Sequence, residues 1–247
     1  MQHLKLISCK VFYREISYFA ATSKNYTDVT YLRQRLHEYP SKLNKALQDE
    51  IDLVDSGKDV HTNYPPYDAD FDAILIGFGL CSNSIENLSS CKYPLVIPRA
   101  HDCITLFLGS KEQYKDYFFN HKGTYWYNAG WIENASMPGP EQHEAALKKY
   151  RAKYGASADK MVTASEEWRK GYQSLAFIRW NEFDTSRFEQ FARKCAAYAG
   201  WEYSALQGDS TLMRDFIEGN WDEERFLVVP PGKKIALTYD EKIITYD

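Results

Sequence analysis

Three cysteines occupy matching positions in the sequence, because each follows a segment typical of a β-strand. Cys9 ends KLISC, Cys81 follows DAILIGFGL, and Cys103 ends YPLVIPRAHDC. In open α/β sheets the carboxyl ends of the parallel strands meet at one edge, and ligands bind there. We therefore expect the three thiols to converge at one edge of a sheet, with His101 next to Cys103.

Sulfur and imidazole donors suit zinc or iron, so Cys9, Cys81, Cys103 and His101 are the candidate metal ligands. The set lacks the paired close spacing of common zinc motifs, and it does not distinguish zinc from ferrous iron. His101 is either a ligand or a general base. His37, in RLHEYP just before a predicted helix, is a candidate for the same edge as a fourth ligand or general base.

The turns around these cysteines contain residues that suit a bound cofactor or anion. Gly77 and Gly79 have no side chain, so a backbone segment or a ligand can approach closely at the end of the strand. Arg99, beside a predicted helix N-terminus, suits a carboxylate or phosphate. The first turn of that helix also predicts a lowered pKa for Cys103. This Gly-x-Gly pair lacks the third glycine of a dinucleotide-binding motif and the lysine of a P-loop, which argues against NAD and ATP sites.

The alternative interpretation is that the thiols are buried turn residues without ligand chemistry, since free cysteine is among the most buried residue types. A covalent dyad of His101 and Cys103 requires the loop to fold back, and it ranks below metal binding. Cys91, in a loop, and Cys195, within an amphipathic helix, are expected to be structural.

Hydrophobic periodicity predicts the elements that position these residues. Apolar residues at helical spacing predict a helix with Ser41 as N-cap and an end at Gly57. Another helix begins at Asp102 and is interrupted at Gly109. Segment 22–35 is polar and 61–71 is turn-rich. The elements predicted for this half are strands at 4–9, 73–80 and 94–98 and helices at 11–21, 41–57 and 103–121.

The second half contains a strand and turn in GTYWYNAGW, a long polar helix broken at Gly155, and then a strand-helix-strand-helix-strand order with a terminal hairpin. We predict an α/β protein with two Rossmann-like lobes, mainly parallel sheets, and a cleft at the carboxyl ends of the strands. The predicted parts are an N-terminal lobe at 1–135 with the Cys/His cluster, a helical connection at 136–172 and a C-terminal lobe at 173–247.

Composition narrows the class of protein. The 30 basic and 34 acidic residues give a net charge of -4, and no basic block indicates nucleic-acid binding. No uninterrupted apolar stretch approaches the roughly 20 residues of a membrane span. Five cysteines without secretory context indicate reduced thiols and a cytoplasmic protein. The 15% aromatic content predicts core and interface packing and is compatible with a homodimer.

Four segments, GFGLCSNS, VIPRAHDCITLFLGS, GTYWYNAGW and FLVVPPGKKI, resemble the proteins grouped as domain of unknown function 1638 (DUF1638), and the likeness covers nearly the whole chain. The resemblance implies a one-carbon or corrinoid context, because genes of the family are often found among those for corrinoid-dependent methyltransferases. It identifies no reaction. The usual family form has glycines where this chain has Ser82 and Ser84, so the turn after Cys81 is expected to be stiffer here.

Two functions from different classes follow. The first is a zinc or iron protein that serves as a metal-dependent component of corrinoid-linked methyl transfer, with a corrinoid protein or a methyltransferase as partner. An open position on the metal would activate a thiol or water. The second is a non-catalytic binding protein that holds a small anion, a corrinoid or another tetrapyrrole in a cleft between the lobes.

Overall fold

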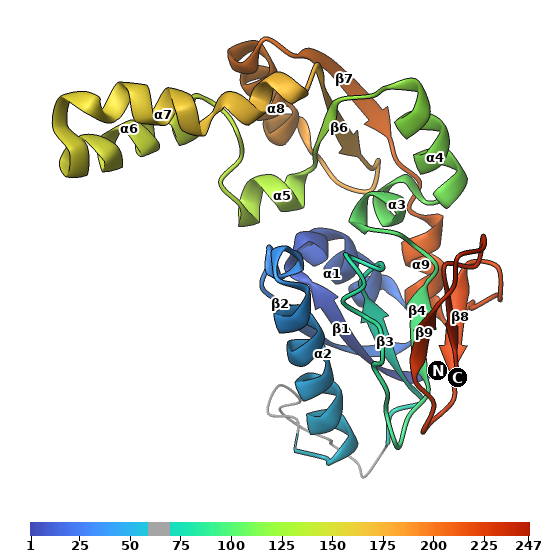
Figure 1. Cartoon of the computed structure of the whole chain (residues 1–247). Coiled ribbons are helices and arrows are strands. Elements are labelled where there is room, and N and C mark those ends of the chain that lie inside the picture. The colour runs from blue at the N-terminus through green and yellow to red at the C-terminus, as the bar shows by residue number, and fades with distance from the viewer. Residues whose placement is uncertain (59–69) are drawn as a thin grey trace. The chain divides into compact units, whose positions relative to one another are not determined.

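The computed structural model describes residues 1–58 and 70–247, so residues 61–69 of the predicted turn-rich segment lie outside it. The chain divides into two compact units (Figure 1). Unit 1 comprises Met1–Gln113 and Asp209–Asp247, and unit 2 comprises Tyr114–Gly208. Each unit contains its own mainly parallel sheet, which confirms the predicted α/β class with two Rossmann-like lobes.

The sheet of unit 1 has five strands in the order β2-β1-β3-β4-β8. The first four run parallel, and β8 pairs antiparallel with β4. From β1 the chain adds β2 on one side, and from β3 it adds β4 on the other side. The boundary between β1 and β3 is therefore the topological switch point, where ligands bind in doubly wound folds. The strands span His3–Cys9 (β1), Tyr26–Leu32 (β2), Ala73–Gly77 (β3), Leu95–Pro98 (β4) and Phe226–Val229 (β8).

Helix α2 of unit 1 buries Leu43, Leu47, Ile51 and Val54, as their helical spacing predicts. It begins one residue earlier than expected, since Pro40 occupies the first turn and Tyr39, rather than Ser41, is the N-cap. The helices of unit 1 are α1 (Tyr13–Thr22), α2 (Pro40–Asp55), α3 (Cys103–Leu108), the first part of α4 (Lys111–Asn120) and α9 (Thr211–Glu218), with 3-10 turns at Lys10–Phe12 and Leu36–Glu38.

Gly109 separates α3 from α4, as predicted, with a backbone φ of 87° that favours glycine. A Cβ atom there would lie 2.6 Å from the backbone oxygen of Asp209. The chain leaves unit 1 after Gln113 and returns to it at Asp209. The absence of a side chain at Gly109 leaves room for the returning backbone.

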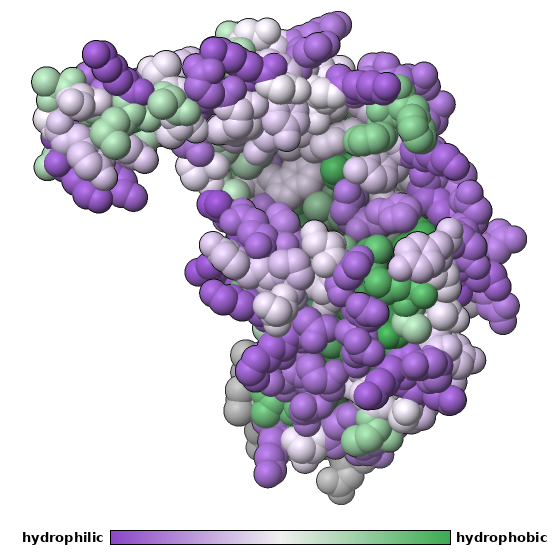
Figure 2. All heavy atoms as spheres, in the orientation of Figure 1, coloured by the Kyte–Doolittle hydropathy of each residue, from purple (hydrophilic) through white to green (hydrophobic). Residues whose placement is uncertain are grey.

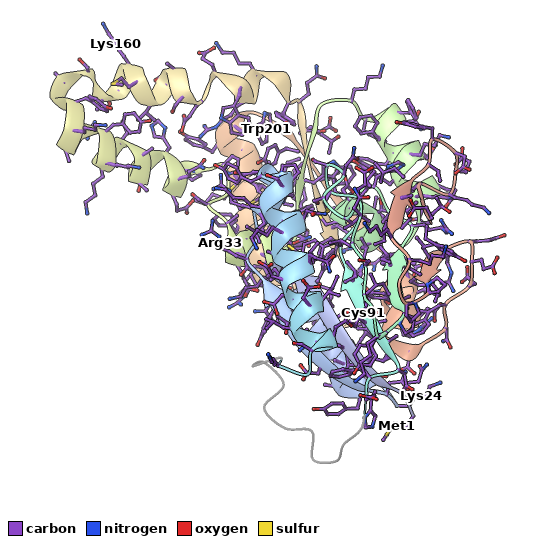
Figure 3. The ribbon with its side chains drawn as sticks, turned by 60° about the horizontal axis from the view of Figure 1, so that its bottom comes forward. Met1, Lys24, Arg33, Cys91, Lys160 and Trp201 are labelled. Atoms are coloured by element: carbon purple, nitrogen blue, oxygen red, sulfur yellow. The ribbon has the colours of Figure 1, made fainter. Side chains whose placement is uncertain are left out.

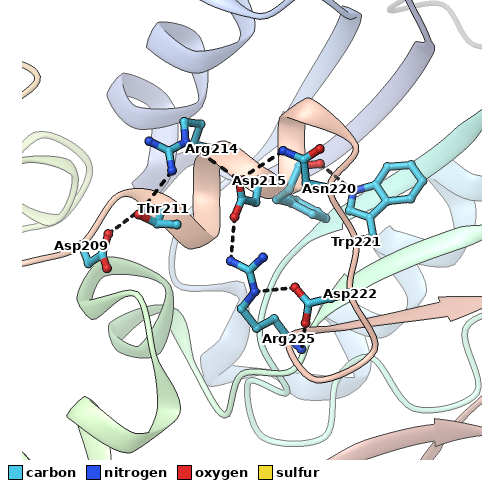
Figure 4. A network of polar contacts seen from close by, with 9 residues as sticks. Asp209, Thr211, Arg214, Asp215, Asn220, Trp221, Asp222 and Arg225 are labelled. Atoms are coloured by element: carbon cyan, nitrogen blue, oxygen red, sulfur yellow. Dashed lines mark hydrogen bonds and ion pairs between the residues drawn. The ribbon is translucent and has the colours of Figure 1, made fainter.

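The returning segment is anchored by a polar network between α9 and β8 (Figure 4). The Arg225 guanidinium donates to Asp215 at 2.7 Å and to Asp222 at 2.6 Å. The carbonyl of Arg225 then accepts a hydrogen bond from the Arg99 backbone at 2.8 Å, next to the β4–β8 pair. The chain ends in an antiparallel hairpin of β9 (Ile235–Leu237) and β10 (Ile244–Tyr246), as predicted.

Unit 2 has a parallel sheet in the order β5-β6-β7. Tyr125 on β5 contacts the rings of Trp168, Tyr172 and Trp201, with centroids 5.0–5.7 Å apart, so these aromatic residues pack on one another. The elements are β5 (Thr124–Tyr127), β6 (Ser174–Arg179), β7 (Glu202–Gln207), α5 (Ala129–Asn134), α6 (Pro140–Tyr154), α7 (Ala158–Ser165) and α8 (Ser186–Ala199), with 3-10 turns at Gly155–Ser157 and Glu167–Gly171.

The boundaries of the units differ from the predicted 1–135, 136–172 and 173–247. The helical segment belongs to unit 2, and residues 209–247 belong to unit 1. The predicted strand-helix order is correct, but β8 joins β4 instead of continuing the sheet of β6 and β7. Periodicity identifies a buried strand without identifying its partner, which explains the difference.

Polar and charged side chains cover much of the face shown in Figure 2. Within the described parts of the chain, no helix is both long enough and apolar enough to cross a membrane.

Candidate functional site

Three strand ends in unit 1 carry the cysteines. Cys9 is the last residue of β1, Cys81 lies four residues after β3, and Cys103 is the first residue of α3 after β4. Because these strands are parallel, all three cysteines lie at the carboxyl edge, around the β1/β3 switch point. In Figure 3, Met1 and Lys24 mark the end of the sheet where β1 and β2 begin. Arg33 follows β2 and marks the opposite end, where the strands reach their carboxyl ends.

The three thiols, hereafter the thiol group, lie close enough to interact electrostatically. Burial raises the pKa of Cys9 to about 11. Burial, followed by the negative charges of Cys9 and Asp102, raises the pKa of Cys81 to about 12. The pKa of Cys103 is raised well above its usual value by burial, Asp102, Cys81 and Cys9. The strand topology thus shows the predicted convergence at one edge of the sheet, and the raised pKa values keep the thiols protonated at neutral pH.

The lowered pKa predicted for Cys103 is wrong. Cys103 does begin α3, and Asp102 caps this helix by accepting from the backbone of Ile104 at 2.9 Å and of Thr105 at 3.3 Å. The desolvation of the thiol and the charge of the capping carboxylate raise its pKa, and they outweigh the dipole of a helix of six residues.

Two backbone hydrogen bonds join the turns that carry Cys81 and Cys103. The amide of Leu80 donates to the carbonyl of Ala100 at 2.7 Å, and that of Cys81 donates to the carbonyl of His101 at 2.9 Å. Gly79 permits this pairing, since a Cβ atom there would lie 2.8 Å from the backbone nitrogen of Asp102. The close approach at Gly79 therefore serves the backbone of the protein itself.

Gly77 has a similar role. A Cβ atom at Gly77 would collide with the hydroxyl of Ser8 and lie 2.7 Å from its Cβ atom. Ser8 is fully buried and donates to the carbonyl of Gly77 at 3.1 Å. Of the two occupants that the sequence allows beside these glycines, a backbone segment or a cofactor, the structure shows neighbouring segments of the chain.

The turn after β3 adopts a rare backbone conformation. Cys81, Ser82 and Asn83 have φ angles of 45°, 61° and 65°, in the left-handed region that non-glycine residues seldom occupy. The hydroxyl of Ser84 donates to the carbonyl of Cys81 at 2.6 Å and closes the turn. A glycine at position 82 would adopt this conformation without a steric penalty, and the serine here stores strain beside a thiol.

The histidines do not join the thiol group. The His101 side chain is exposed, and His101 contributes its carbonyl to the pairing with Cys81. His37 is exposed on a 3-10 turn, where its charge lowers the pKa of Glu38 as a minor contribution after the hydrogen bond from Arg35. The structure thus brings the three cysteines to one edge of the sheet, while both imidazoles are exposed to solvent.

Arg99 faces the C-terminal part of unit 1 and is 9% exposed. Its guanidinium donates to the carbonyl of Glu223 at 2.9 Å, to that of Lys242 at 2.8 Å and to that of Ile244. These contacts hold the hairpin of β9 and β10 beside β4. Arg99 is therefore engaged with backbone carbonyls, where the sequence predicts an anion site.

Across residues 1–58 and 70–247, no group of three or more His, Cys, Asp or Glu side chains is arranged to hold a metal ion. The donor chemistry of the thiol group suits zinc or iron, but its side-chain arrangement is not a preformed ligand sphere. Cys91 is exposed in the loop before β4, at the opposite edge of the sheet, and Cys195 is buried in α8 of unit 2. Both lie outside the thiol group, as predicted.

One polar residue at this edge escapes the sequence analysis. Gln34, two residues after β2, is 6% exposed, and its Oε1 atom has no hydrogen-bond partner within the described residues. The signal was available in the alternation of apolar and charged residues around it, in Leu32, Arg33, Arg35 and Leu36. The polar character of segment 22–35 as a whole conceals that alternation.

Comparison with known proteins identifies the family without an activity. No curated protein and no solved structure matches the chain. The model of a protein family described as "Protein of unknown function (DUF1638)" matches residues 31–217. That range contains Gln34, Cys81 and Cys103 but not Cys9. Because the match covers most of the 247 residues, the chain belongs to the DUF1638 family.

Proposed function

We propose that the thiol group binds a thiophilic divalent metal, zinc or iron. The observation that carries the proposal is the position of Cys9, Cys81 and Cys103 at the carboxyl ends of three neighbouring parallel strands, around the switch point between β1 and β3. Three thiols so close together repel one another when ionised, whereas a cation stabilises all three thiolates. Sulfur is the donor that zinc and iron share.

Binding requires the side chains to adjust, because they do not form a preformed ligand sphere. Cys9, Cys81 and Cys103 supply sulfur, and the strained turn at Cys81, Ser82 and Asn83 is the segment best suited to move. His101 is the candidate fourth ligand or general base, since its backbone already pairs with Cys81. A bound metal would supply Lewis acidity, which lowers the pKa of a coordinated thiol or water.

The proposal places this metal protein in corrinoid-linked one-carbon transfer, with a corrinoid protein or methyltransferase as partner. Support for that context comes from the family resemblance alone. A reducing cytoplasm would keep the thiols free for metal binding.

The competing proposal is a non-catalytic protein that holds an anion, a corrinoid or another tetrapyrrole. In its anion form it relies on Arg99, whose guanidinium donates to the carbonyls of Glu223, Lys242 and Ile244. An anion would have to replace these hydrogen bonds, so metal binding has the stronger support.

Isothermal titration calorimetry of zinc into chelator-treated protein tests the proposal. Because the thiols are protonated before binding, titrations in two buffers of different ionisation enthalpy should show the release of about three protons at neutral pH. Cys103→Ser should abolish the high-affinity phase, and Cys91→Ser, at the opposite edge, should leave it unchanged. Wild-type protein that takes up no zinc, or that binds it without proton release, would contradict the proposal.

A further inference from the structure

Strand β2 forms an open edge of the unit 1 sheet (Figure 1). In a parallel pair, every second residue directs its N–H and C=O groups toward the neighbouring strand. The amide of Tyr26 donates to the carbonyl of Gln2 at 2.9 Å, so the even-numbered residues of β2 face β1. The backbone groups of Thr27, Val29 and Tyr31 therefore point away from the sheet, and within residues 1–58 and 70–247 they have no hydrogen-bond partner.

This edge lacks the features that usually prevent pairing with another strand. Edge strands are commonly short, or they carry lysine, proline or a bulge. β2 has seven residues in continuous register with β1, and its sequence, YTDVTYL, contains neither lysine nor proline. Its one charged residue, Asp28, is paired with the buried Lys5 at 3.1 Å. The edge is therefore open to backbone pairing.

Exposed tyrosine rings lie beside this edge. Tyr26 of β2 is 51% exposed. Tyr13 of α1 is 50% exposed, and its ring contacts that of Tyr31 with centroids 5.3 Å apart. Tyrosine is enriched in the cores of protein interfaces. The edge thus combines unpaired backbone groups with an aromatic contact surface.

The outer strand of the unit 2 sheet, β7, differs in its charges. Glu202 begins β7 and is exposed. The guanidinium of Arg193 lies 4.0 Å from the ring centroid of Tyr203 and pairs with Glu189 at 2.6 Å. Charged side chains at an edge discourage strand pairing. The sequence and surroundings of β2 therefore make it the better edge for association.

We propose that β2 pairs antiparallel with β2 of a second copy of this chain, around a twofold axis at Val29. Directly opposed residues of an antiparallel pair that face each other exchange two N–H···O=C bonds. An axis at Val29 pairs this residue with itself and pairs Thr27 with Tyr31. All the outward backbone groups of both copies then gain partners, and a twofold axis closes the assembly as a dimer.

The charges around β2 permit this register. Each Asp28 lies opposite a threonine of the other copy, whereas an axis at Asp28 would bring two carboxylates together. The positive side chains that flank β2 are paired within their own chain, Lys24 with Glu218 at 3.9 Å and Arg35 with Glu38 at 2.6 Å. The two copies therefore meet without unpaired like charges at Lys24 and Arg35.

Two matched proline variants separate this edge from the other. Val29→Pro removes the outward N–H at the axis and keeps the ladder with β1, because edge strands tolerate proline where the N–H faces outward. The amide of Glu202 donates to the carbonyl of Gln173, so Ala205 also directs its N–H outward, and Ala205→Pro makes the same change in β7. Circular dichroism verifies that each variant is folded.

Sedimentation equilibrium of the full chain measures the dimer. We expect wild type and Ala205→Pro to associate equally as dimers, and Val29→Pro to raise the dissociation constant by about 10-fold or more. A folded Val29→Pro protein that dimerises like the wild type would overturn the proposal. Wild-type protein that stays monomeric at every concentration would also overturn it.

Hydrogen exchange of the wild type adds a readout that does not depend on the folding of a variant. The amides of Thr27, Val29 and Tyr31 should exchange more slowly above the dissociation constant of the dimer than below it, while exchange in β7 stays the same. A dimer that leaves the exchange of these three amides unchanged uses another surface, which would refute pairing through β2.

Discussion

The thiols at Cys9, Cys81 and Cys103 are held in the protonated form by their surroundings. Burial is the largest cause of the raised pKa at each residue, and repulsion between neighbouring thiolates adds to it at Cys81 and Cys103. An ordinary cysteine is partly ionised at pH 8, whereas these thiols are not. Without a cation, the thiol group is a weak nucleophile.

Alkylation of chelator-treated protein with iodoacetamide should reflect this difference. The carboxylate of Asp55 also raises the pKa of Cys91, but Cys91 is exposed and should be modified first at pH 8, followed slowly by the thiol group. The thiolate fraction of a cysteine rises steeply with pH below its pKa and levels off above it. Because the pKa of Cys9 is raised, modification of Cys9 should keep accelerating up to about pH 11. Peptide mass spectrometry measures the rates. Modification of Cys9 and Cys81 at pH 8 as fast as that of Cys91 would contradict the raised pKa values.

Arg99 shows how far a residue's role depends on distant parts of the chain. The sequence predicts an anion-binding side chain at a helix N-terminus, but the carbonyls that Arg99 contacts come more than 120 residues later. No local pattern identifies these partners. The same limit applies to Gly77 and Gly79, whose neighbours are Ser8 and the backbone of Asp102.

Arg99→Lys should lower the free energy of unfolding by about 2 kcal/mol, because one ammonium group does not span carbonyls on two separate segments. Urea denaturation measures this loss, and zinc uptake per folded molecule should remain that of the wild type. Unchanged stability together with weakened anion binding would instead favour an anion site at Arg99.

At the scale of elements, the turn after β3 combines strain with the position of a thiol. Ser82 has a φ of 61°, and a glycine adopts this conformation without a steric penalty. We expect Ser82→Gly to raise the free energy of unfolding by about 1 kcal/mol. Ser84→Gly, the matched control, should lower it, because Ser84 loses its hydrogen bond to the carbonyl of Cys81. Destabilisation by Ser82→Gly would show that the strain is absent.

The pairing of the two thiol-bearing turns depends on Gly79. In Gly79→Ala the new methyl group would press on backbone atoms of Ala100 and Asp102, which should cost more than about 2 kcal/mol and separate Cys81 from Cys103. Gly171→Ala is the control, since no atom lies within 4 Å of a Cβ built there. Differential scanning calorimetry compares the two variants. A Gly79→Ala protein as stable as Gly171→Ala would refute the close approach.

Elements with strong apolar patterns were predictable from the sequence, and weakly patterned ones were not. β3 and β4 are buried along their whole length, and α2 buries a regular stripe, so periodicity identifies all three. β2 carries no such signal because it lies at the edge of the sheet, where only Thr30 among its seven residues is buried. Its polar sequence therefore lacks the period of two that marks a half-buried strand.

For the whole molecule, the existence of two lobes was predictable from the sequence, but the segments that form each lobe were not. The chain interrupts unit 1 after Gln113, forms unit 2, and returns at Asp209 to add β8 antiparallel to β4. Sequence order alone favours neighbouring partners, which places β8 after β7. The convergence of the thiols was still foreseeable, since it depends only on β1, β3 and β4 being parallel.

Metal content of tag-free protein purified anaerobically tests the central claim most directly. Inductively coupled plasma mass spectrometry should find about one equivalent of zinc or iron in wild type and in Cys91→Ser, and none in Cys81→Ser or Cys103→Ser. That result would establish the thiol group as a metal site. Wild-type protein without metal, or full metal content in both variants, would contradict the claim.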